Sequence, residues 1–315
     1  MLIIPSNMND LFRTFTTAFN KAQQAAAGRV GKFGATVEDL AFIMSVTGAS
    51  TTHAWMEQIR GMREWIGPRA VGNIKAGGLT VVNRNFEATV GVPVPAIDDD
   101  QYGVYAPIIA QLGSAGEQLW KQLLIEAMLG NANWADGNPF FCSGRVLSED
   151  SGAITNAVTT ALSATALETA LSAMQGWKLF AGDPADVTPT TLLVGPAKES
   201  VARGILLAEL VNDGANVQVS NTLKDRLDLR VDNRITGNQW FVLASKNGLK
   251  AFVVQKRKTA VLTRRDNATD SCVFTNNEAQ YGADARGEAF GALPFLAYAG
   301  GLDAVSAFDA TKVPA

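Results

Sequence analysis

The chain has 315 residues, of which 47% are hydrophobic and 18% charged, and its formal net charge is −3. This composition can bury one large core or two medium ones, and the weak acidity argues against a dedicated nucleic-acid binder, which would need a basic stripe. No apolar run approaches the ~20 residues that a membrane helix needs, and the N-terminal stretch lacks the basic flank of a signal peptide. We expect a folded protein that is made and used in water, with no membrane partner.

Residues 7–27 are predicted to form a short amphipathic helix. Its narrow apolar stripe consists of Leu11, Phe12, Phe15 and Phe19, which recur at helical spacing. Because this stripe is too small to form a core, the helix must lie on its own subunit or on a neighbour. After a short amphipathic turn at 38–43, residues 48–63 again show apolar residues at helical spacing.

Residues 65–95 are predicted to form a β-hairpin. They combine glycine and asparagine with β-branched residues in partial alternation, and both Gly77-Gly78 and the run 83–85 offer a turn at the tip. Neither strand has an apolar face strong enough for a core sheet. A hairpin that cannot bury itself suggests an arm that reaches a neighbour.

The longest amphipathic helix of the sequence is expected from about Ala106 to Gly130-Asn131, both of which suit a C-cap. Before it, Asp98, Asp99 and Asp100 are N-cap candidates, since negative charge is favourable at a helix N-terminus. Three carboxylates could also bind a divalent cation. The EF-hand pattern is missing, however, and capping explains these residues, so no metal site is predicted.

The rest of the chain mixes helices and strands. Residues 134–141 form a turn that closes on two aromatics, residues 151–177 show helical spacing, and the buried strand 191–195 leads into a helix that starts at Pro196. Three successive strands between residues 223 and 260 suggest antiparallel pairing, and a further short strand is expected at 271–274. No internal repeat is visible.

Enzyme signatures are absent from the sequence. The single histidine, His53, could act as a base, and Cys142 and Cys272 lie far apart without a CxxC partner. We interpret His53 and Cys142 as structural residues and predict no catalytic site, cofactor or metal. The basic residues 256–258 and 264–265 could meet DNA phosphates or keep a strand edge solvated, and these two interpretations stay open.

Several short motifs follow one another along residues 55–300. They are Trp65 with Gly67, Pro68 and Arg69; the run 83–87; the run 97–100 with Gly103; Asp136-Gly137 with Phe140-Phe141; the run 193–196; and the run 281–286. No single motif is specific, but in this order they resemble the Mu-like major head subunit family of tailed bacteriophages, which shares the Hong Kong 97 type capsid fold.

The resemblance implies an α+β fold in five parts. These are an N-terminal arm with its first helices (1–64), a β-hairpin called the E-loop (65–96), a peripheral domain with a long spine helix (97–150), an axial domain (151–249), and a return to the peripheral sheet with a C-terminal tail (250–315). The long helix would be the spine helix, capped by Asp98 to Asp100, and the N-terminal helix would lie on a neighbouring subunit.

The resemblance also implies a major capsid protein that is not an enzyme. Copies would assemble into hexamers and pentamers of an icosahedral shell around double-stranded DNA, with which they make weak, non-specific contacts. Further expected partners are a scaffolding protein, a maturation protease, a portal and decoration proteins. Assembly would take place in the cytoplasm of the bacterial host and end in the virion.

Intersubunit contacts are expected from the N-terminal helix and the hairpin. The candidates are Phe12, Phe15, Phe19, Arg69, Lys75, Arg84, Phe86 and Glu87, with Arg60, Arg63, Arg69 and Arg84 as candidates for ion pairs that set subunit register. Lys75 is interpreted as an ordinary exposed lysine rather than a cross-linking residue. Since only about 50 residues precede the first motif, scaffolding is expected from a separate protein.

Three alternatives remain open at this level. Within the same fold, the chain could form a cellular nanocompartment shell, similar to the encapsulins, that stores an enzyme. From other classes, it could be an α/β enzyme that uses His53 or Cys142, or a tail or adhesion protein.

Overall fold

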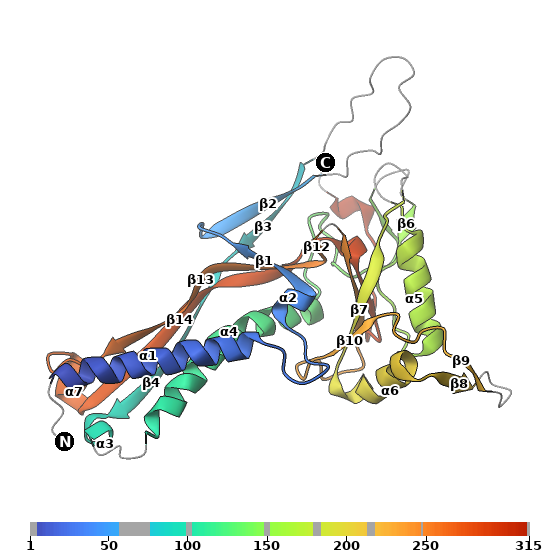
Figure 1. Cartoon of the computed structure of the whole chain (residues 1–315). Coiled ribbons are helices and arrows are strands. Elements are labelled where there is room, and N and C mark those ends of the chain that lie inside the picture. The colour runs from blue at the N-terminus through green and yellow to red at the C-terminus, as the bar shows by residue number, and fades with distance from the viewer. Residues whose placement is uncertain are drawn as a thin grey trace, which may run out of the picture.

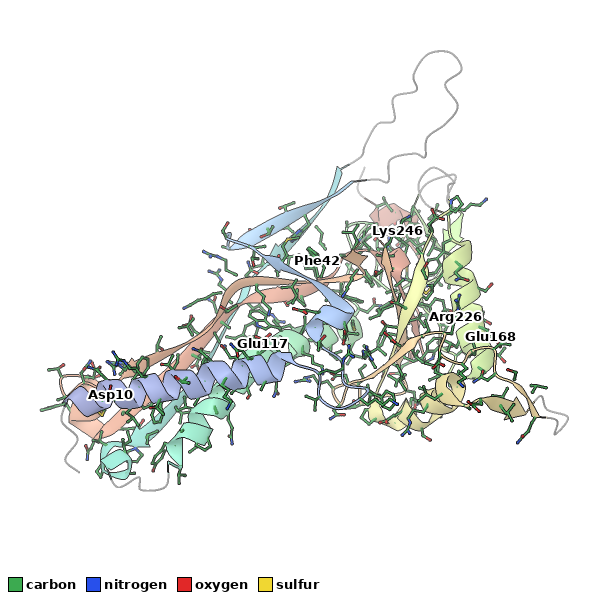
Figure 2. The ribbon with its side chains drawn as sticks, viewed as in Figure 1. Asp10, Phe42, Glu117, Glu168, Arg226 and Lys246 are labelled. Carbon is green, nitrogen blue, oxygen red and sulfur yellow. The ribbon has the colours of Figure 1, made fainter. Side chains whose placement is uncertain are left out.

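The computed structural model describes residues 5–56, 76–98, 103–147, 152–178, 184–212, 218–246 and 248–313. They form an elongated α+β molecule in which two larger sheets lie toward opposite ends (Figure 1). Asp10 lies at the end of the longer sheet, and Glu168 and Arg226 lie at the other end (Figure 2). One continuous cluster of buried apolar side chains runs through both parts. No helix of the described residues is long and apolar enough to cross a membrane.

The four-stranded sheet has the order β1-β13-β14-β4. Its strands are β1 (Ala41–Ser45), β13 (Phe252–Arg265), β14 (Glu278–Gly291) and β4 (Arg84–Pro93). β1 is parallel to β13, and the other neighbours are antiparallel. Along β14, buried residues alternate with partly exposed ones, as expected for a strand with one covered face.

Two long helices cover the buried face of this sheet. They are α1 (Pro5–Ala27) and α4 (Tyr105–Gly130), which pack against each other while α4 contacts β13 and β14. Both helices confirm the sequence prediction, and α4 ends as expected at Asn131, whose φ is 46°. The helices approach closely at Gly113, where an added Cβ would lie 2.4 Å from the carbonyl oxygen of Phe19.

The second sheet is built around β7 (Thr188–Val194). β10 (Asp228–Val231) runs parallel to β7 on one side and β11 (Trp240–Lys246) antiparallel on the other, while β12 (Leu249–Lys250) and β15 (Ala297–Gly300) pair with β11. Two helices belong to this end of the molecule. α5 (Ala164–Gly176) has Ser163 as N-cap, and α6 (Pro196–Leu207) starts at Pro196 as predicted.

The remaining elements are short. Three two-stranded ladders consist of β2 (Ser50–Met56) with β3 (Ala76–Val82), β5 (Arg145–Val146) with β6 (Ala153–Ile154), and β8 (Leu210–Asn212) with β9 (Gln218–Ser220). The short helices are α2 (Val37–Leu40), α3 (Val94–Asp98) and α7 (Ser271–Asn276), with 3-10 turns at Pro294–Leu296 and Ala310–Lys312.

Several local predictions are wrong. Residues 50–56 form a strand instead of a helix, because their serine and threonines pair with β3. β3 therefore does not pair with β4, which joins the four-stranded sheet, so the hairpin begins before residue 65. Residues 271–276 form a helix instead of a strand.

The antiparallel pairing predicted for residues 223–260 is confirmed only between β11 and β12 and is otherwise wrong. β10 and β11 do not pair with each other, since both flank β7, and β13 belongs to the other sheet. The C-terminal strand β15 pairs with β11, so the end of the chain returns to the five-stranded sheet and not to the four-stranded one. Sequence patterns report which faces are apolar, but pairing over such distances depends on the whole core.

Candidate assembly surfaces

The β2–β3 hairpin joins the body of the molecule at its base. There Val81 is buried with Val253 and Phe290 in a small apolar cluster. The His53 ring lies over the Phe290 ring with 4.7 Å between centroids, and His53 Nε2 lies 3.0 Å from Gln255 Oε1. From this base the two strands extend away from the longer sheet (Figure 1).

A chain of polar side chains fixes the role of His53. Gln255 donates its amide N–H to Asn83 Oδ1 at 2.8 Å, and Asn83 donates to the carbonyl of Gly48 at 3.0 Å. The amide oxygen of Gln255 is thereby the acceptor and His53 Nε2 the donor. His53 thus holds the hairpin on the sheet, in agreement with the structural interpretation of this residue.

Cys142 is not placed to act as a nucleophile. Its side chain is fully buried, and burial raises the pKa of its thiol although Arg145 lies nearby. Because the thiolate is the reactive species, a raised pKa makes this cysteine inert. Within the part of the chain that the structure describes, no three His, Cys, Asp or Glu side chains come together to hold a metal.

The predicted contact residues of the N-terminal helix lie mainly inside the subunit. Phe15 and Phe19 are buried, and the Phe15 ring meets Tyr281 edge-on at 5.2 Å. The prediction that they touch a neighbour is therefore wrong, because α4 and β14 of the same chain already cover them. Phe12 is partly buried under Arg264, whose guanidinium lies 4.5 Å from the ring centre.

On the edge strand β4, Arg84 is engaged within the chain. Its guanidinium contacts Glu288 at 2.5 and 3.0 Å and Glu126 at 3.2 Å, and the hydrogen bond to Glu288 raises its pKa despite partial burial. Phe86 is partly buried, and Glu87 is exposed and accepts a hydrogen bond from Thr89. A contact of these residues with a neighbour stays a prediction. Arg69 and Lys75, like Arg60 and Arg63, lie outside the described residues.

The predicted cap of the long helix is wrong. Val104, whose side chain has no acceptor oxygen, occupies the N-cap position of α4. Asp98 is instead the last residue of α3, and Asp99 and Asp100 lie outside the described residues. Gly103, at φ 65°, stands between the acidic run and the helix, so the chain turns before α4 begins.

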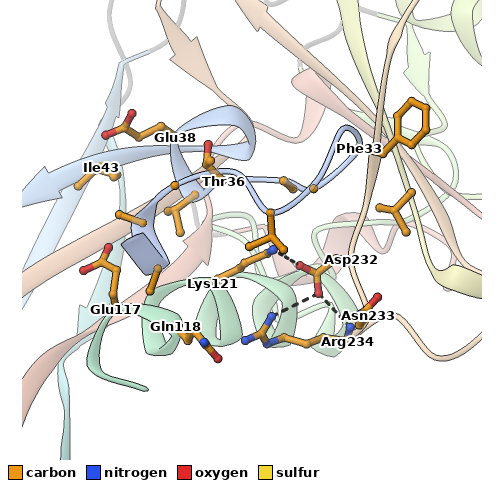
Figure 3. Close-up of a pocket in the computed structure, with 18 of the residues that line it drawn as sticks. Phe33, Thr36, Glu38, Ile43, Glu117, Gln118, Lys121, Asp232, Asn233 and Arg234 are labelled. Carbon is orange, nitrogen blue, oxygen red and sulfur yellow. Dashed lines mark hydrogen bonds and ion pairs between the residues drawn. The ribbon is translucent and has the colours of Figure 1, made fainter. Parts of the chain in front are cut away.

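A cleft of about 770 Å³ lies where the two sheet regions meet (Figure 3). Lys121 of α4 forms an ion pair of 2.7 Å with Asp232, which follows β10 and is fully buried, and Arg234 lies 3.6 Å from the same carboxylate. Removing one partner of such a pair would leave a buried charge without compensation. The pair therefore joins the long helix to the five-stranded sheet.

The sequence reasoning missed the exposed apolar residues at the α6 end. Val201 is 42% exposed, Leu207 37%, Leu210 52% and Val219 37%. A helical projection of residues 196–207 could have found the first two, because one face of this helix lacks charge. Phe274 of α7 is 85% exposed, but the wrong strand prediction there gave no reason to notice it.

Comparison with known proteins assigns the chain to a family. A family model described as Mu-like prophage major head subunit gpT matches residues 8–158, and a model described as phage capsid protein matches residues 89–287. The Mu-like prophage FluMu major head subunit of Haemophilus influenzae is 26% identical over 251 residues, 79% of this chain and 60% of that protein. The major capsid protein of Escherichia phage Mu is 24% identical over 143 residues, 45% of each chain.

Solved structures agree with this assignment. The procapsid of bacteriophage JBD30 aligns with a TM-score of 0.55 and 23% identity, over 94% of this chain and 75% of the procapsid chain. The chain spans about half the length of the two curated relatives from Haemophilus influenzae and phage Mu. The chain is similar to the Mu-like major head subunits over residues 8–158. Since the phage capsid model matches more than half of its residues, the chain belongs to the phage capsid proteins and has the Hong Kong 97 type fold.

Proposed function

We propose that this chain is the major capsid protein of a tailed phage or prophage. Copies assemble into hexamers and pentamers of an icosahedral shell that encloses double-stranded DNA. The observation that carries the proposal is the β2–β3 hairpin, which projects from a body that holds it at its base (Figure 1). A two-stranded hairpin is marginal by itself in water, so its extension gains stability from a neighbouring subunit.

The parts of the molecule take the roles that the family suggests. The E-loop comprises β2, β3 and the segment between them. The peripheral domain is the four-stranded sheet with α4, and α1 takes the place of the N-terminal arm while packed on its own subunit. The axial domain is the five-stranded sheet with α5 and α6 and includes β15. Asp98 ends α3 and does not cap the spine helix, whose N-cap is Val104.

Contacts with packaged DNA are weak and non-specific. Four basic residues of β13 are engaged within the chain, while Arg257 is exposed. Lys256 contacts Glu117 at 3.1 Å, and Lys258 contacts Asp284. Arg264 hydrogen-bonds Asn9 at 2.6 Å, and Arg265 hydrogen-bonds Ser271 at 3.2 Å. Cations already paired neutralise fewer phosphates, so this supports the strand-edge interpretation over a DNA site.

The proposed partners are a scaffolding protein, a maturation protease, a portal and decoration proteins. Assembly takes place in the cytoplasm of the bacterial host, and the chain itself is not an enzyme. The buried Cys142 and the hydrogen-bonded His53 support this last point. The variant His53→Ala should therefore assemble, although with a less firmly held hairpin. Hydrolase activity that this substitution abolishes would instead support the enzyme alternative.

Electron cryo-microscopy of the protein expressed with and without its scaffold tests the proposal. We expect closed shells or hexameric and pentameric capsomers, with the β2–β3 hairpin lying on the next subunit. A compact monomer under both conditions would contradict it. Shells that contain a cargo protein and no genome would favour the nanocompartment alternative.

A further inference from the structure

Helix α6 presents an uncharged face to solvent. Its exposed residues on that face are Pro196, Ala197, Ser200, Val201, Gly204 and Leu207, whereas Ala202, Ile205 and Leu206 are buried against the five-stranded sheet. Arg203 lies at the edge of this face, 3.8 Å from Glu199. A surface helix ordinarily directs charged side chains toward water. The exposed face of α6 therefore has the composition of a covered one.

Gly204 lies in the middle of this face, and no contact within the chain requires a glycine at this position. A Cβ added there would meet no atom within 4 Å. In the interior of a helix, glycine is unfavourable relative to alanine. Within the described helices, the other interior glycines are packed: a Cβ on Gly113 would meet Phe19, and one on Gly116 would meet Ala260. By this comparison, Gly204 provides room for something outside its own chain.

The β8–β9 hairpin directly follows α6 and projects from this end of the molecule (Figure 1). Leu210 and Val219 are both exposed but lie on opposite faces of the hairpin, because Val219 pairs with Val211 and Leu210 with Ser220. Asn221 holds the base of the hairpin to the end of α6 by donating to the carbonyls of Ile205 at 2.7 Å and Ala208 at 2.9 Å. The hairpin is thus fixed in direction, while Leu210 and Val219 stay exposed within the same chain.

We propose that these two surfaces are the two halves of one contact between copies of this chain. The β8–β9 hairpin of one copy lies across the uncharged face of α6 in the next, where Gly204 lets the backbones approach. Because the two surfaces are different, the contact can run head-to-tail from one copy to the next, and such a contact closes into a ring when the rotation allows. This inference rests on the proposed function, because a capsomer is such a ring.

Charged residues at the edge of the contact are also compatible with a second copy of this chain as the partner. Glu209, at the base of the hairpin, lies 2.8 Å from Lys224, and Arg203, at the edge of the α6 face, lies 3.8 Å from Glu199. Both pairs are exposed to solvent, so their charges can also meet those of a second copy. Opposite charges on the two halves of a head-to-tail contact fix its register more than they add affinity. A second copy would thus supply the apolar surface, with charged residues of both signs at its edge.

The variant Gly204→Ala separates folding from assembly. The isolated subunit should unfold at the same or a higher urea concentration than wild type, because alanine favours the helix and its Cβ meets open space. The yield of shells with scaffold, measured by sedimentation, should fall about ten-fold, as expected from overpacking a close contact. Gly176→Ala is the matched control, since a Cβ at this last residue of α5 also meets nothing. Wild-type shell yield from Gly204→Ala would overturn the inference.

Cysteine pairs test the geometry independently of shell formation. Copies with Leu207→Cys are mixed with copies carrying Val219→Cys and oxidised; Cys142 and Cys272 are buried and add little background. Cross-linked dimers should form in the mixture and not with Gly176→Cys in place of Leu207→Cys. Cross-links that form only between identical variants, or none at all, would overturn the inference. Cross-linked dimers from the two cysteine variants, together with no shells from the wild type, would contradict the proposed function alone.

Discussion

Helices α4 and α6 each contain an interior glycine, and the two glycines differ in what surrounds them. At Gly113 the backbone of α1 lies so close that a Cβ would be 2.4 Å from an oxygen of Phe19, whereas at Gly204 there is open space. The first helix finds its neighbour within the chain and the second does not. One subunit can thus carry helix surfaces that its own chain covers and other helix surfaces that become covered only on assembly.

The largest effect should come from the contact between α1 and α4, which is complete within one chain. Phe19→Ala removes a fully buried ring between α1 and α4, and such truncations cost about 3–5 kcal/mol. Urea denaturation of the isolated subunit would measure this loss. Leu207→Ala on the exposed face of α6 is the control and should change stability by less than ~0.5 kcal/mol. Equal losses from the two variants would mean that α6 is as well covered as α1.

The two glycines give the next largest effect, with opposite signs. Gly113→Ala should destabilise the subunit by about 2 kcal/mol, because the new Cβ would displace the backbone of α1 by more than the helix gains. Gly204→Ala should be neutral or stabilise the subunit by up to ~1 kcal/mol. Thermal or urea denaturation of both variants checks the signs. A stabilising Gly113→Ala would show that α1 does not pack on α4 in solution.

The sequence predicted what depends on local pattern. The stripe of Phe15 and Phe19 predicted α1, and the periodicity before Gly130-Asn131 predicted α4, because burial on one face leaves a 3.6-residue signal. It failed at residues 50–56, where helical spacing of a few side chains competed with strand pairing to β3. Pairing partners are not encoded in a local period, so the position of β15 beside β11 could not be read either.

For the candidate contact residues, too, the sequence predicted local features but not which chain covers them. An apolar stripe on an N-terminal helix must be covered, but the sequence does not say by which chain, and the structure covers Phe15 and Phe19 from within. The acidic run at 98–100 suits a helix start, yet Gly103 turns the chain before α4 begins. The uncharged face of α6 was visible in the sequence, but its exposure was not, since a buried helix has the same composition.

The smallest effect is expected at Asp39, whose side chain links α2 to strand β10 of the five-stranded sheet. Its carboxylate lies 2.9 Å from Arg29 and 3.3 Å from Arg230 of β10, and it accepts the Thr36 N–H at 3.1 Å in the capping box of α2. Burial by itself would raise the pKa of Asp39, but the hydrogen bonds from Thr36 and Arg29 and the charge of Arg230 outweigh it and hold the pKa below its ordinary value.

Asp39→Asn should therefore cost about 1 kcal/mol at neutral pH, the usual value of a cap and a charge-assisted hydrogen bond that is partly exposed. A carboxylate with a lowered pKa stabilises the fold above its ordinary pKa of 3.8 and loses this contribution as the pH falls through the lowered value. The difference in unfolding free energy between wild type and variant should stay constant from pH 7 to about pH 4 and shrink below it. Urea denaturation at each pH measures it, and a difference that grows in acid would show that Asp39 does not join the two regions as an ion.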